Sequence, residues 1–330
     1  MPSPSSHPSP AAAARPLDRR APAVLILVRD LTADVAAFDE ALRARGARPI
    51  IRRPEALTIR IDGRRPVILE ADGSPLTPDA CLGWTSLAAR DAGLWLLKAL
   101  EMAGVPVMNR AAVLDAGQLK PTLSLRLAAA GLPHARTLIA GADADPDALI
   151  AGLGLPMVVK PCLGTKGGGV GPLGHRAELI ARLAEAGAAR LPLYLQEFLP
   201  NDGSDLRIQC VDHRPVYAFR RHAAPGAFVA NLHAGGRAEA LTSIPPALAR
   251  LATAAARAVD APLAGVDLIE VPGRGPVILE VNMTPGIYTA ATLAGPNRPV
   301  LEPLARQAVD LLAQSLIRLA GDGLRRRQAA

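Results

Sequence analysis

The sequence predicts an α/β fold, and two patterns near the beginning of the chain support this prediction. The apolar run Ala23–Val28 is typical of a strand buried in a parallel sheet. The segment 32–45 then carries apolar residues at helical spacing and ends at Gly46. The chain has 330 residues, 50% of them hydrophobic, so it can supply cores for two or three packed units.

The other elements of this first unit are short. Strand patterns at 48–51, 56–61 and 66–70 are separated by glycine and proline, and a helix is expected at 86–103, before Pro106. A first α/β domain over residues 23–108 therefore closes near Asn109. The preceding residues 1–22 are rich in proline, serine and alanine, and we expect them to form a disordered tail.

Strand patterns dominate the rest of the chain. A helix at 116–130 contains Lys120, although Pro121 must disturb or start it. The other expected helices lie at 176–186, 246–259 and 301–319, and the expected strands at 136–139, 156–160, 193–198, 205–211 and 214–221. We divide this part into a unit at 109–195, a unit at 196–320 and a tail at 321–330, and find no internal repeat.

Composition narrows the class of protein. A net charge of +7 and a pI near 9.9 favour anionic partners, but no aromatic-and-basic stripe or basic recognition helix predicts nucleic-acid binding. Cys81, Cys162 and Cys210 are scattered among apolar residues, which fits reduced thiols in the cytoplasm and predicts neither a disulfide nor zinc. The apolar run at 24–28 is too short to span a membrane.

Three oxygen-bearing side chains near the C-terminus form a pattern typical of a metal site. Side chains alternate along a strand, so Glu280 and Asn282 share one face, and Asp267 on a preceding apolar segment can approach them from a neighbouring strand. Magnesium prefers such carboxylate and amide oxygens, and the set suggests phosphoryl chemistry. The alternative is a strand that ends in an Asn-x-Thr-Pro-Gly turn for reasons of backbone geometry alone.

A lysine and a glycine-rich loop suit polyphosphate binding. Lys160 ends the strand at 156–160, and Gly167, Gly168 and Gly169 lie in the loop that follows. Glycines let backbone N–H groups approach phosphate oxygens, while the lysine neutralises their charge. The loop lacks the register of a Walker A loop, and a plain turn is the alternative.

Two further segments carry polar groups at strand ends. The strand at 194–199 ends in Gln196 and Glu197, so it could be a hinge that presents backbone groups to adenine. Asp205 and Arg207 lie on one face of the next strand, and Arg221 ends the strand after that. These residues suit phosphate or carboxylate binding, and a charged sheet face in water is the alternative.

These pieces, in this order over residues 109–292, resemble the ATP-grasp superfamily and most closely the RimK-type carboxylate–amine (glutamate) ligases. The matched segments are Lys120, 159–161, the glycine loop, 196–198, 205–207, 231–236, 264–267 and 280–286. The resemblance implies an ATP-grasp fold, in which an N-terminal α/β pre-ATP-grasp domain precedes a central lobe and a C-terminal lobe that hold ATP between them.

The resemblance also implies residue roles. Lys120 and Lys160 would contact phosphates, and Asp205 would lie near the ribose. Asp267, Glu280 and Asn282 would hold Mg²⁺, with two ions expected and Mn²⁺ as a substitute. The remaining residues expected to contact ATP are Gly167, Gly168, Gly169, Gln196, Glu197, Phe198, Leu199 and Asn231.

The implied reaction forms an amide. A substrate carboxylate attacks the γ-phosphate of ATP to give an acylphosphate, and an amine then displaces phosphate. Arg207 and Arg221 are candidates to offset charge in the transition state. His233 is a candidate for proton transfer, with ordinary hydrogen bonding in a loop as the alternative.

The sequence departs from the family pattern at two places. The expected Phe-Arg-Ser-Asn reads Phe-Val-Ala-Asn here, so Val229 stands where an arginine is expected. The usual Arg-Arg pair is shifted, with Arg221 in the first position and His222 in the second. Both departures concern recognition of the acceptor.

Glutamate is the favoured amino acid, because a basic protein suits substrates with several carboxylates. Because Val229 stands where an arginine is expected, we favour a cofactor of the methanopterin or methanofuran type as the acceptor. A protein tail or an amino-group carrier protein is the alternative, and a non-catalytic nucleotide-binding module is an alternative of another class. The resemblance also implies a homo-oligomer, a dimer or a tetramer.

Overall fold

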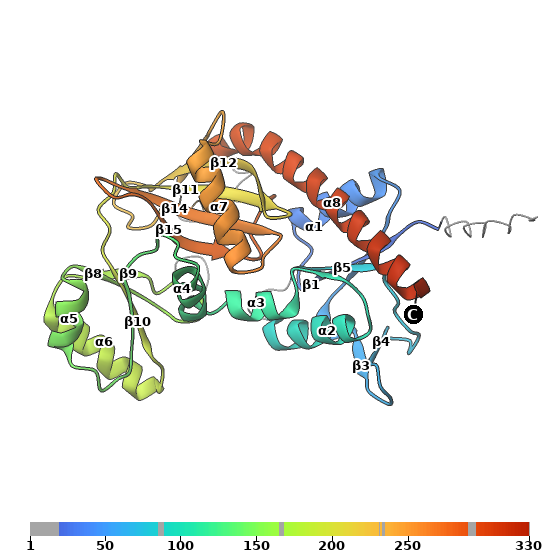
Figure 1. Cartoon of the computed structure of the whole chain (residues 1–330), viewed down its shortest axis with the longest axis horizontal. Coiled ribbons are helices and arrows are strands. Elements are labelled where there is room, and N and C mark those ends of the chain that lie inside the picture. Colours follow the sequence, from blue (N-terminus) through green and yellow to red (C-terminus); the bar gives the residue numbers. More distant parts are fainter. Residues whose placement is uncertain are drawn as a thin grey trace, which may run out of the picture.

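The computed structural model describes residues 20–84, 89–164, 168–230, 232, 235–289 and 295–329. Three larger sheets, each with helices packed on it, form the framework of this part of the chain, and a fourth sheet has two strands (Figure 1). The mixture of helices and sheets confirms the predicted α/β class.

The N-terminal domain is built on a parallel sheet of order β2-β1-β5-β6. Strand β1 (Ala23–Val28) is buried along its whole length because both faces of the sheet are covered. The other elements are α1 (Ala33–Ala44), β2 (Arg48–Arg52), η1 (Pro54–Ala56), β3 (Thr58–Arg60), β4 (Val67–Leu69), β5 (Ala80–Trp84), α2 (Arg90–Met102) and β6 (Val107–Met108).

Some details of this domain differ from the prediction. The sequence pattern missed β5, whose five residues lie between β1 and β6 in the sheet, and it also missed the two residues of β6. The expected strand at 56–61 is shorter, because Pro54 begins a 3-10 turn and pairing starts only at Thr58. Strands β3 and β4 form a separate two-stranded hairpin.

The central lobe has an antiparallel sheet of order β7-β10-β8-β9. The expected helix at 116–130 begins later, as α4, because Pro121 lies in its first turn and starts it, and α3 before it was not predicted. The lobe contains α3 (Ala111–Gly117), α4 (Lys120–Ala129), β7 (Thr137–Ala140), α5 (Pro146–Leu153), β8 (Met157–Lys160), β9 (Gly171–Leu173), α6 (Arg176–Ala189) and β10 (Leu193–Glu197). Because β10 ends at Glu197, the boundary expected after residue 195 falls inside this strand.

The C-terminal lobe has an antiparallel sheet of order β13-β12-β11-β14-β15. Its elements are β11 (Ser204–Val211), β12 (Arg214–His222), β13 (Arg237–Ala240), α7 (Pro246–Ala258), β14 (Ala264–Val271), β15 (Gly275–Asn282), η4 (Gly295–Asn297) and α8 (Arg298–Ala329). Apolar residues of α7 pack with one face of this sheet, and those of α8 and α1 pack with the other.

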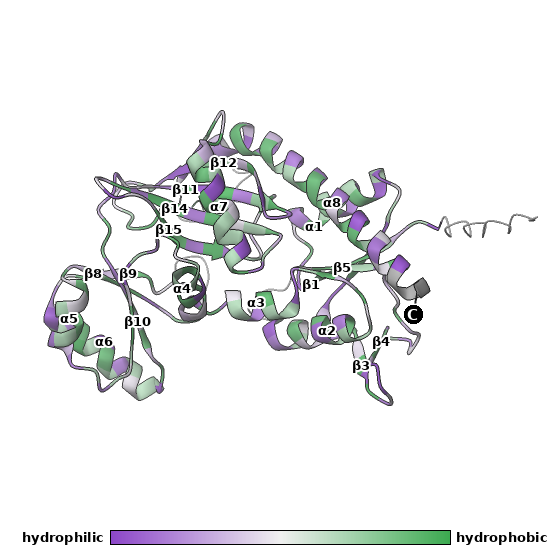
Figure 2. Ribbon diagram, viewed as in Figure 1, coloured by the Kyte–Doolittle hydropathy of each residue, from purple (hydrophilic) through white to green (hydrophobic). Residues whose placement is uncertain are grey.

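Helix α8 connects the C-terminal lobe to the N-terminal domain (Figure 1). Apolar and polar segments alternate along it (Figure 2), as expected for a helix with one buried face. A tail was expected at 321–330, but the helix continues to Ala329. Close packing explains this extension, because a Cβ at Gly323 would lie 2.8 Å from the carbonyl oxygen of Asp79.

Candidate functional site

A row of charged side chains crosses the sheet of the C-terminal lobe. Asp267 on β14 lies directly opposite Glu280 on β15 and opposite Arg207 on β11. Gly265, two residues before Asp267, lies opposite Asn282. The structure therefore brings the three expected metal ligands to one face of neighbouring strands, as their spacing predicts.

Asp267 is held by two arginines. Its Oδ1 accepts a short hydrogen bond from Nε of Arg207, and its Oδ2 accepts one of 2.9 Å from the same guanidinium. A guanidinium nitrogen of Arg221 lies 3.0 Å from Oδ2. The amide nitrogen of Asn282 also donates to Oδ2, at 3.3 Å. Both expected catalytic arginines thus face a carboxylate and position it.

Asp205 completes a buried network of alternating charge. Arg221 donates to both of its carboxylate oxygens, at 2.6 and 2.7 Å. Burial alone would raise the pKa of Asp267, but Arg207 and Arg221 outweigh burial and hold this pKa below its usual value. Burial works against the cation at Arg221, yet Asp267 and Asp205 raise its pKa. At Asp205 burial has the larger effect and raises the pKa, although Arg221 works against it. The arginines therefore favour the ionised form of Asp267 in particular.

One lysine of the central lobe lies near this network, and a second lysine lies near the first. Lys160, at the end of β8, is close enough to Glu280 and Asp267 for both carboxylates to favour its charged form. Burial outweighs them and, with Lys120 nearby, lowers the pKa of Lys160 to about 8. Nζ of Lys120 donates to the carbonyl oxygen of Gly164 at 2.8 Å, so it also fixes the start of the glycine loop. The lysines are brought together, as the sequence predicts.

Gln196 belongs to a cluster of polar side chains in the central lobe. Its amide nitrogen lies 3.0 Å from Oγ1 of Thr137 and 3.3 Å from Nε2 of His134. Oγ of Ser124 lies 3.2 Å from the same His134 nitrogen and 2.7 Å from the hydroxyl of Tyr194. Burial, with a contribution from Lys160, lowers the pKa of His134 to about 4, so this ring is neutral.

The Glu197 side chain is a bridge between the lobes. Its carboxylate accepts hydrogen bonds from the backbone N–H of Arg136 at 2.7 Å and from the Arg136 guanidinium at 2.8 Å. Arg274, in the turn between β14 and β15, donates to it at 2.6 Å. Burial would raise the pKa of Glu197, but these donors hold it at about 2. Any adenine contact at this position would therefore use the backbone.

The other residues expected to contact ATP make fewer polar contacts in the structure. Phe198 is 38% exposed, and its ring centroid lies 6.1 Å from that of Phe228. Leu199 packs at the edge of a small apolar cluster, and Gly168 and Gly169 lie in an exposed turn. Three further expected site residues lie outside the described residues: Gly167, Asn231 and His233.

The donor set fits a hard cation. Oδ1 of Asp267 accepts only one hydrogen bond within the described residues, so this oxygen keeps a lone pair for a metal ion. Glu280 opposite it and the side-chain oxygen of Asn282 supply further oxygens of the type that Mg²⁺ prefers. Among the described residues no group of three or more His, Cys, Asp or Glu could hold a metal, so the third ligand of this set would be the asparagine.

Sequence reasoning missed the residues that fix the ends of the two ligand strands. The buried carboxylate of Asp34, in the first turn of α1, accepts the backbone N–H groups of Ile287 and Tyr288. The Asn109 amide nitrogen donates to the carbonyl oxygens of Leu263 and Met283, at 2.7 Å each. Asp34 directly precedes an apolar segment and Asn109 directly follows one, and this position is the one signal that the sequence offers.

Gln209 was also missed. It follows Arg207 on the same face of β11, and it is buried beside Tyr217 and Gly265. Neither of its side-chain amide atoms has a hydrogen-bond partner within the described part of the chain.

Comparison with known proteins finds similar chains. A family model described as a RimK-like ATP-grasp domain matches residues 121–297. A "Probable alpha-L-glutamate ligase" of Xanthomonas campestris pv. campestris (strain 8004) is 35% identical over 262 residues, which are 78% of this chain and 88% of that protein. A "Probable alpha-L-glutamate ligase 2" of Hahella chejuensis (strain KCTC 2396) is 34% identical over 198 residues. This match covers 59% of the present chain and 64% of the relative, just under two thirds of its length.

A solved structure shares the fold. The ATP-grasp ligase PsnB, complexed with its minimal precursor, Mg and ADP, aligns with a TM-score of 0.62 at 21% identity. The alignment covers 86% of this chain and 98% of that one. At this identity the likeness concerns the fold alone.

Proposed function

The chain belongs to the RimK-like ATP-grasp family of ADP-forming ligases, and from this premise we propose that it adds glutamate to a carboxylate-bearing acceptor. One observation carries the proposal. Lys160 of the central lobe lies near Asp267 and Glu280 of the C-terminal lobe. A side chain that can bind phosphate therefore lies close to carboxylates that can bind the metal ion of a polyphosphate.

The charges of this region suit a nucleotide triphosphate. Asp205, Asp267 and Glu280 are balanced and exceeded by Arg207, Arg221, Lys120 and Lys160. Lys120 and Lys160 would bind the phosphates, and the backbone at Glu197 and Leu199 would bind adenine. Asp205 is proposed to act near the ribose through Arg221, since both of its oxygens are occupied.

Asp267, Glu280 and Asn282 would hold Mg²⁺. They would supply oxygen ligands to the ion, whose positive charge would offset the charge that develops during phosphoryl transfer. Arg207 and Arg221 hold Asp267 in place for this purpose, and their positive charge adds to the field on the γ-phosphate. We propose that two metal ions bind here and that Mn²⁺ can replace Mg²⁺.

The proposed reaction has two steps. An acceptor carboxylate oxygen attacks the γ-phosphorus of ATP and forms an acylphosphate. The bond between the γ-phosphorus and the oxygen that joins it to the β-phosphate breaks, and ADP leaves. The amine nitrogen of glutamate then attacks the acyl carbon, phosphate leaves, and the nitrogen loses a proton as the amide forms. The protein's contribution is positional and electrostatic, with His233 a candidate to accept the proton.

The acceptor is proposed to be a polypeptide carboxylate. A solved PsnB complex contains a precursor peptide. We therefore favour a polypeptide acceptor over the cofactor that Val229, at the place of the expected arginine, favours. A cofactor of the methanopterin or methanofuran type is the second candidate, and it is tested in the same assay. The proposal also includes a cytoplasmic homo-oligomer, for which the three free cysteines support the location. Within the described residues no helix is long and apolar enough to cross a membrane.

The test measures ADP release and product mass with ATP, Mg²⁺ and glutamate, adding one acceptor at a time. We expect a mass gain of one or more glutamyl residues that disappears with Glu280→Gln. Glu270→Gln is the matched control, because Glu270 lies on the same hairpin but is exposed and paired with Arg220. ATP binding without turnover on any acceptor would instead support a nucleotide-binding module.

A further inference from the structure

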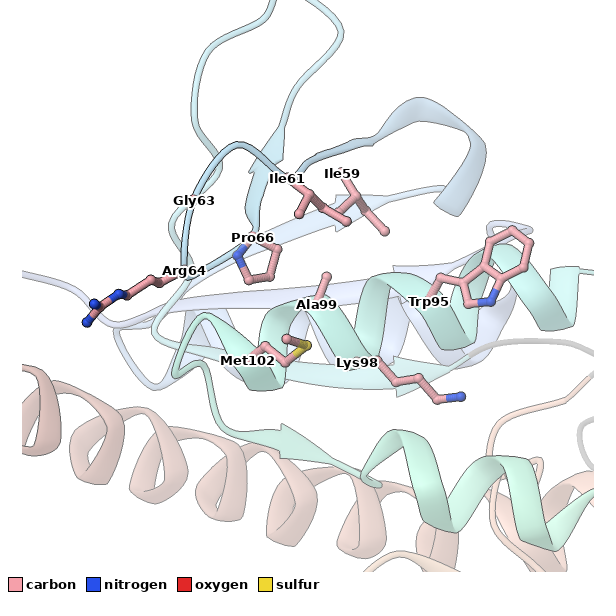
Figure 3. A pocket seen from close by; sticks show the side chains of 9 residues that line it. All are labelled: Ile59, Ile61, Gly63, Arg64, Pro66, Trp95, Lys98, Ala99 and Met102. Atoms are coloured by element: carbon pink, nitrogen blue, oxygen red, sulfur yellow. The ribbon is translucent and has the colours of Figure 1, made fainter.

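A groove on the N-terminal domain exposes apolar side chains far from the charged site. It is a hollow of about 390 Å³ between the β3–β4 hairpin and α2 (Figure 3). Ile59 and Ile61 line it from the hairpin, and Trp95, Ala99 and Met102 line it from α2. We call it the α2 groove. Figure 1 shows α2 and the hairpin at the end of the molecule opposite to α5 and α6.

The helix wall of the groove is a second apolar stripe on α2. Leu94, Leu97 and Leu100 already bury the other face of this helix in the domain core. Trp95 and Met102 nevertheless remain 62% and 65% exposed, and they lie seven residues apart on one face. Ile61 across the groove is 78% exposed. Large apolar side chains gathered at one place on a surface mark an interaction site.

The charges at the groove select its occupant. Arg64 and Lys98 line it together with the apolar residues, and none of the lining residues in the described chain is Asp or Glu. Asp62 nearby is neutralised by Arg60 at 2.7 Å. The nearest carboxylate to Lys98 is Asp115 at 3.8 Å, which Arg90 already holds. An acidic partner is therefore complementary, whereas a second copy joined through the same groove would bring its own Arg64 and Lys98 against these cations.

We propose that the α2 groove docks an acidic amphipathic segment of the polypeptide acceptor, apart from the carboxylate that receives glutamate. The proposal rests on the proposed ligase function. The segment inserts one apolar stripe between the hairpin and α2, with apolar residues three, four and seven positions apart. Its carboxylates contact Arg64 and Lys98. Docking at one end of the enzyme raises the effective concentration of the acceptor at the other.

The experiment uses the full chain and three synthetic peptides of about 18 residues, long enough for a helix of five turns. The first has a leucine stripe and glutamates elsewhere and ends in a free carboxylate. The second has the same composition with the stripe scrambled, and the third replaces glutamate by lysine. We expect the first peptide to bind best, with a blue shift of Trp95 emission, and its affinity to weaken with salt.

Variants locate the binding site. Because truncation of a central tryptophan typically removes much of an interface's affinity, Trp95→Ser should raise Kd about tenfold or more. Lys98→Glu should weaken the first peptide and strengthen the third. Leu191→Ser is the matched control, since Leu191 is equally exposed (61%) but lies in the central lobe. Equal binding of all three peptides, or no effect of Trp95→Ser, overturns the proposal.

Turnover separates the docking proposal from the ligase proposal. With the first peptide as acceptor, Trp95→Ser should raise KM and leave kcat unchanged, and a free diglutamate acceptor should be used equally by both proteins. Turnover of diglutamate without any advantage for the peptide overturns docking alone. Peptide binding at Trp95 without turnover of any acceptor overturns the ligase function alone. Sedimentation that shows wild-type dimers and Trp95→Ser monomers assigns the groove to a second copy and also overturns docking.

Discussion

Gly265 allows Arg207 to reach Asp267, and its replacement by alanine should disturb both stability and catalysis. A Cβ at this position would lie 2.9 Å from Cβ of Pro285 and 3.0 Å from Nη1 of Arg207. Carbon atoms in good contact are about 3.5–4.0 Å apart, so both neighbours must move by several tenths of an ångström. Arg207 is hydrogen-bonded to Asp267, and the proline ring restricts the backbone at Pro285, so neither moves freely.

Overpacking of this kind costs about 1–3 kcal/mol of unfolding free energy. In domains of 150–250 residues each kcal/mol lowers Tm by about 2–4 °C. Because the displaced arginine orients a metal ligand, kcat/KM for ATP should fall by about 10- to 100-fold. The assay is thermal unfolding followed by ADP release, with Gly141→Ala as control, since no atom lies within 4 Å of a Cβ there. Wild-type Tm and turnover in Gly265→Ala would refute the packing argument.

Three further predictions concern other buried polar groups. Glu197→Gln should destabilise the chain by about 1–2 kcal/mol, since it weakens partly exposed charge-assisted hydrogen bonds, but should leave KM for ATP nearly unchanged; a large rise in KM would instead mean a side-chain contact with adenine. The pKa of Lys160 is about 8 against an ordinary 10.5, so its proton is held less tightly in the folded state. The folding stability of the wild type relative to Lys160→Met should therefore be lowest below pH 8 and rise between about pH 8 and 10.5. Over the same range kcat/KM for ATP should fall, because Lys160 loses its charge above about pH 8. Urea titrations and pH–rate profiles that are flat over this range would contradict both expectations. Gln209→Met should stabilise the protein by about 1 kcal/mol or more in denaturant unfolding, because it removes an amide whose burial lacks hydrogen bonds; a loss of stability would show that the amide has a partner.

The ligand strands could be predicted from sequence because their signal is local. Glu280 and Asn282 are two residues apart, and a period of two places them on one face whatever surrounds the strand. Including Asp267 required one assumption, that its strand lies beside the strand of Glu280 and Asn282. The pairing of β14 with β15 confirms this assumption. The order of the motifs was equally informative, and it led to the correct family.

The side-chain partners could not be predicted, because they come from distant segments. Glu197 looked like a hinge residue, yet its carboxylate meets Arg136 and Arg274, which lie 61 and 77 residues away in sequence. Strand β5 was missed for a different reason. Its five residues include Gly83, and a short strand with glycine carries little of the pattern on which strand prediction depends.

The pairing of Asp267 with two arginines has a physical purpose that single residues do not reveal. A carboxylate buried without partners would be protonated and would bind a cation poorly, since burial favours its neutral form. Arg207 and Arg221 keep Asp267 ionised and fix its orientation, while one lone pair of Oδ1 stays available. Asp205 in turn neutralises part of the arginine charge, so the field at Asp267 attracts a divalent cation more than two free arginines would allow. The four side chains therefore work as one unit, and the effect of replacing any one of them should be far from additive with the others.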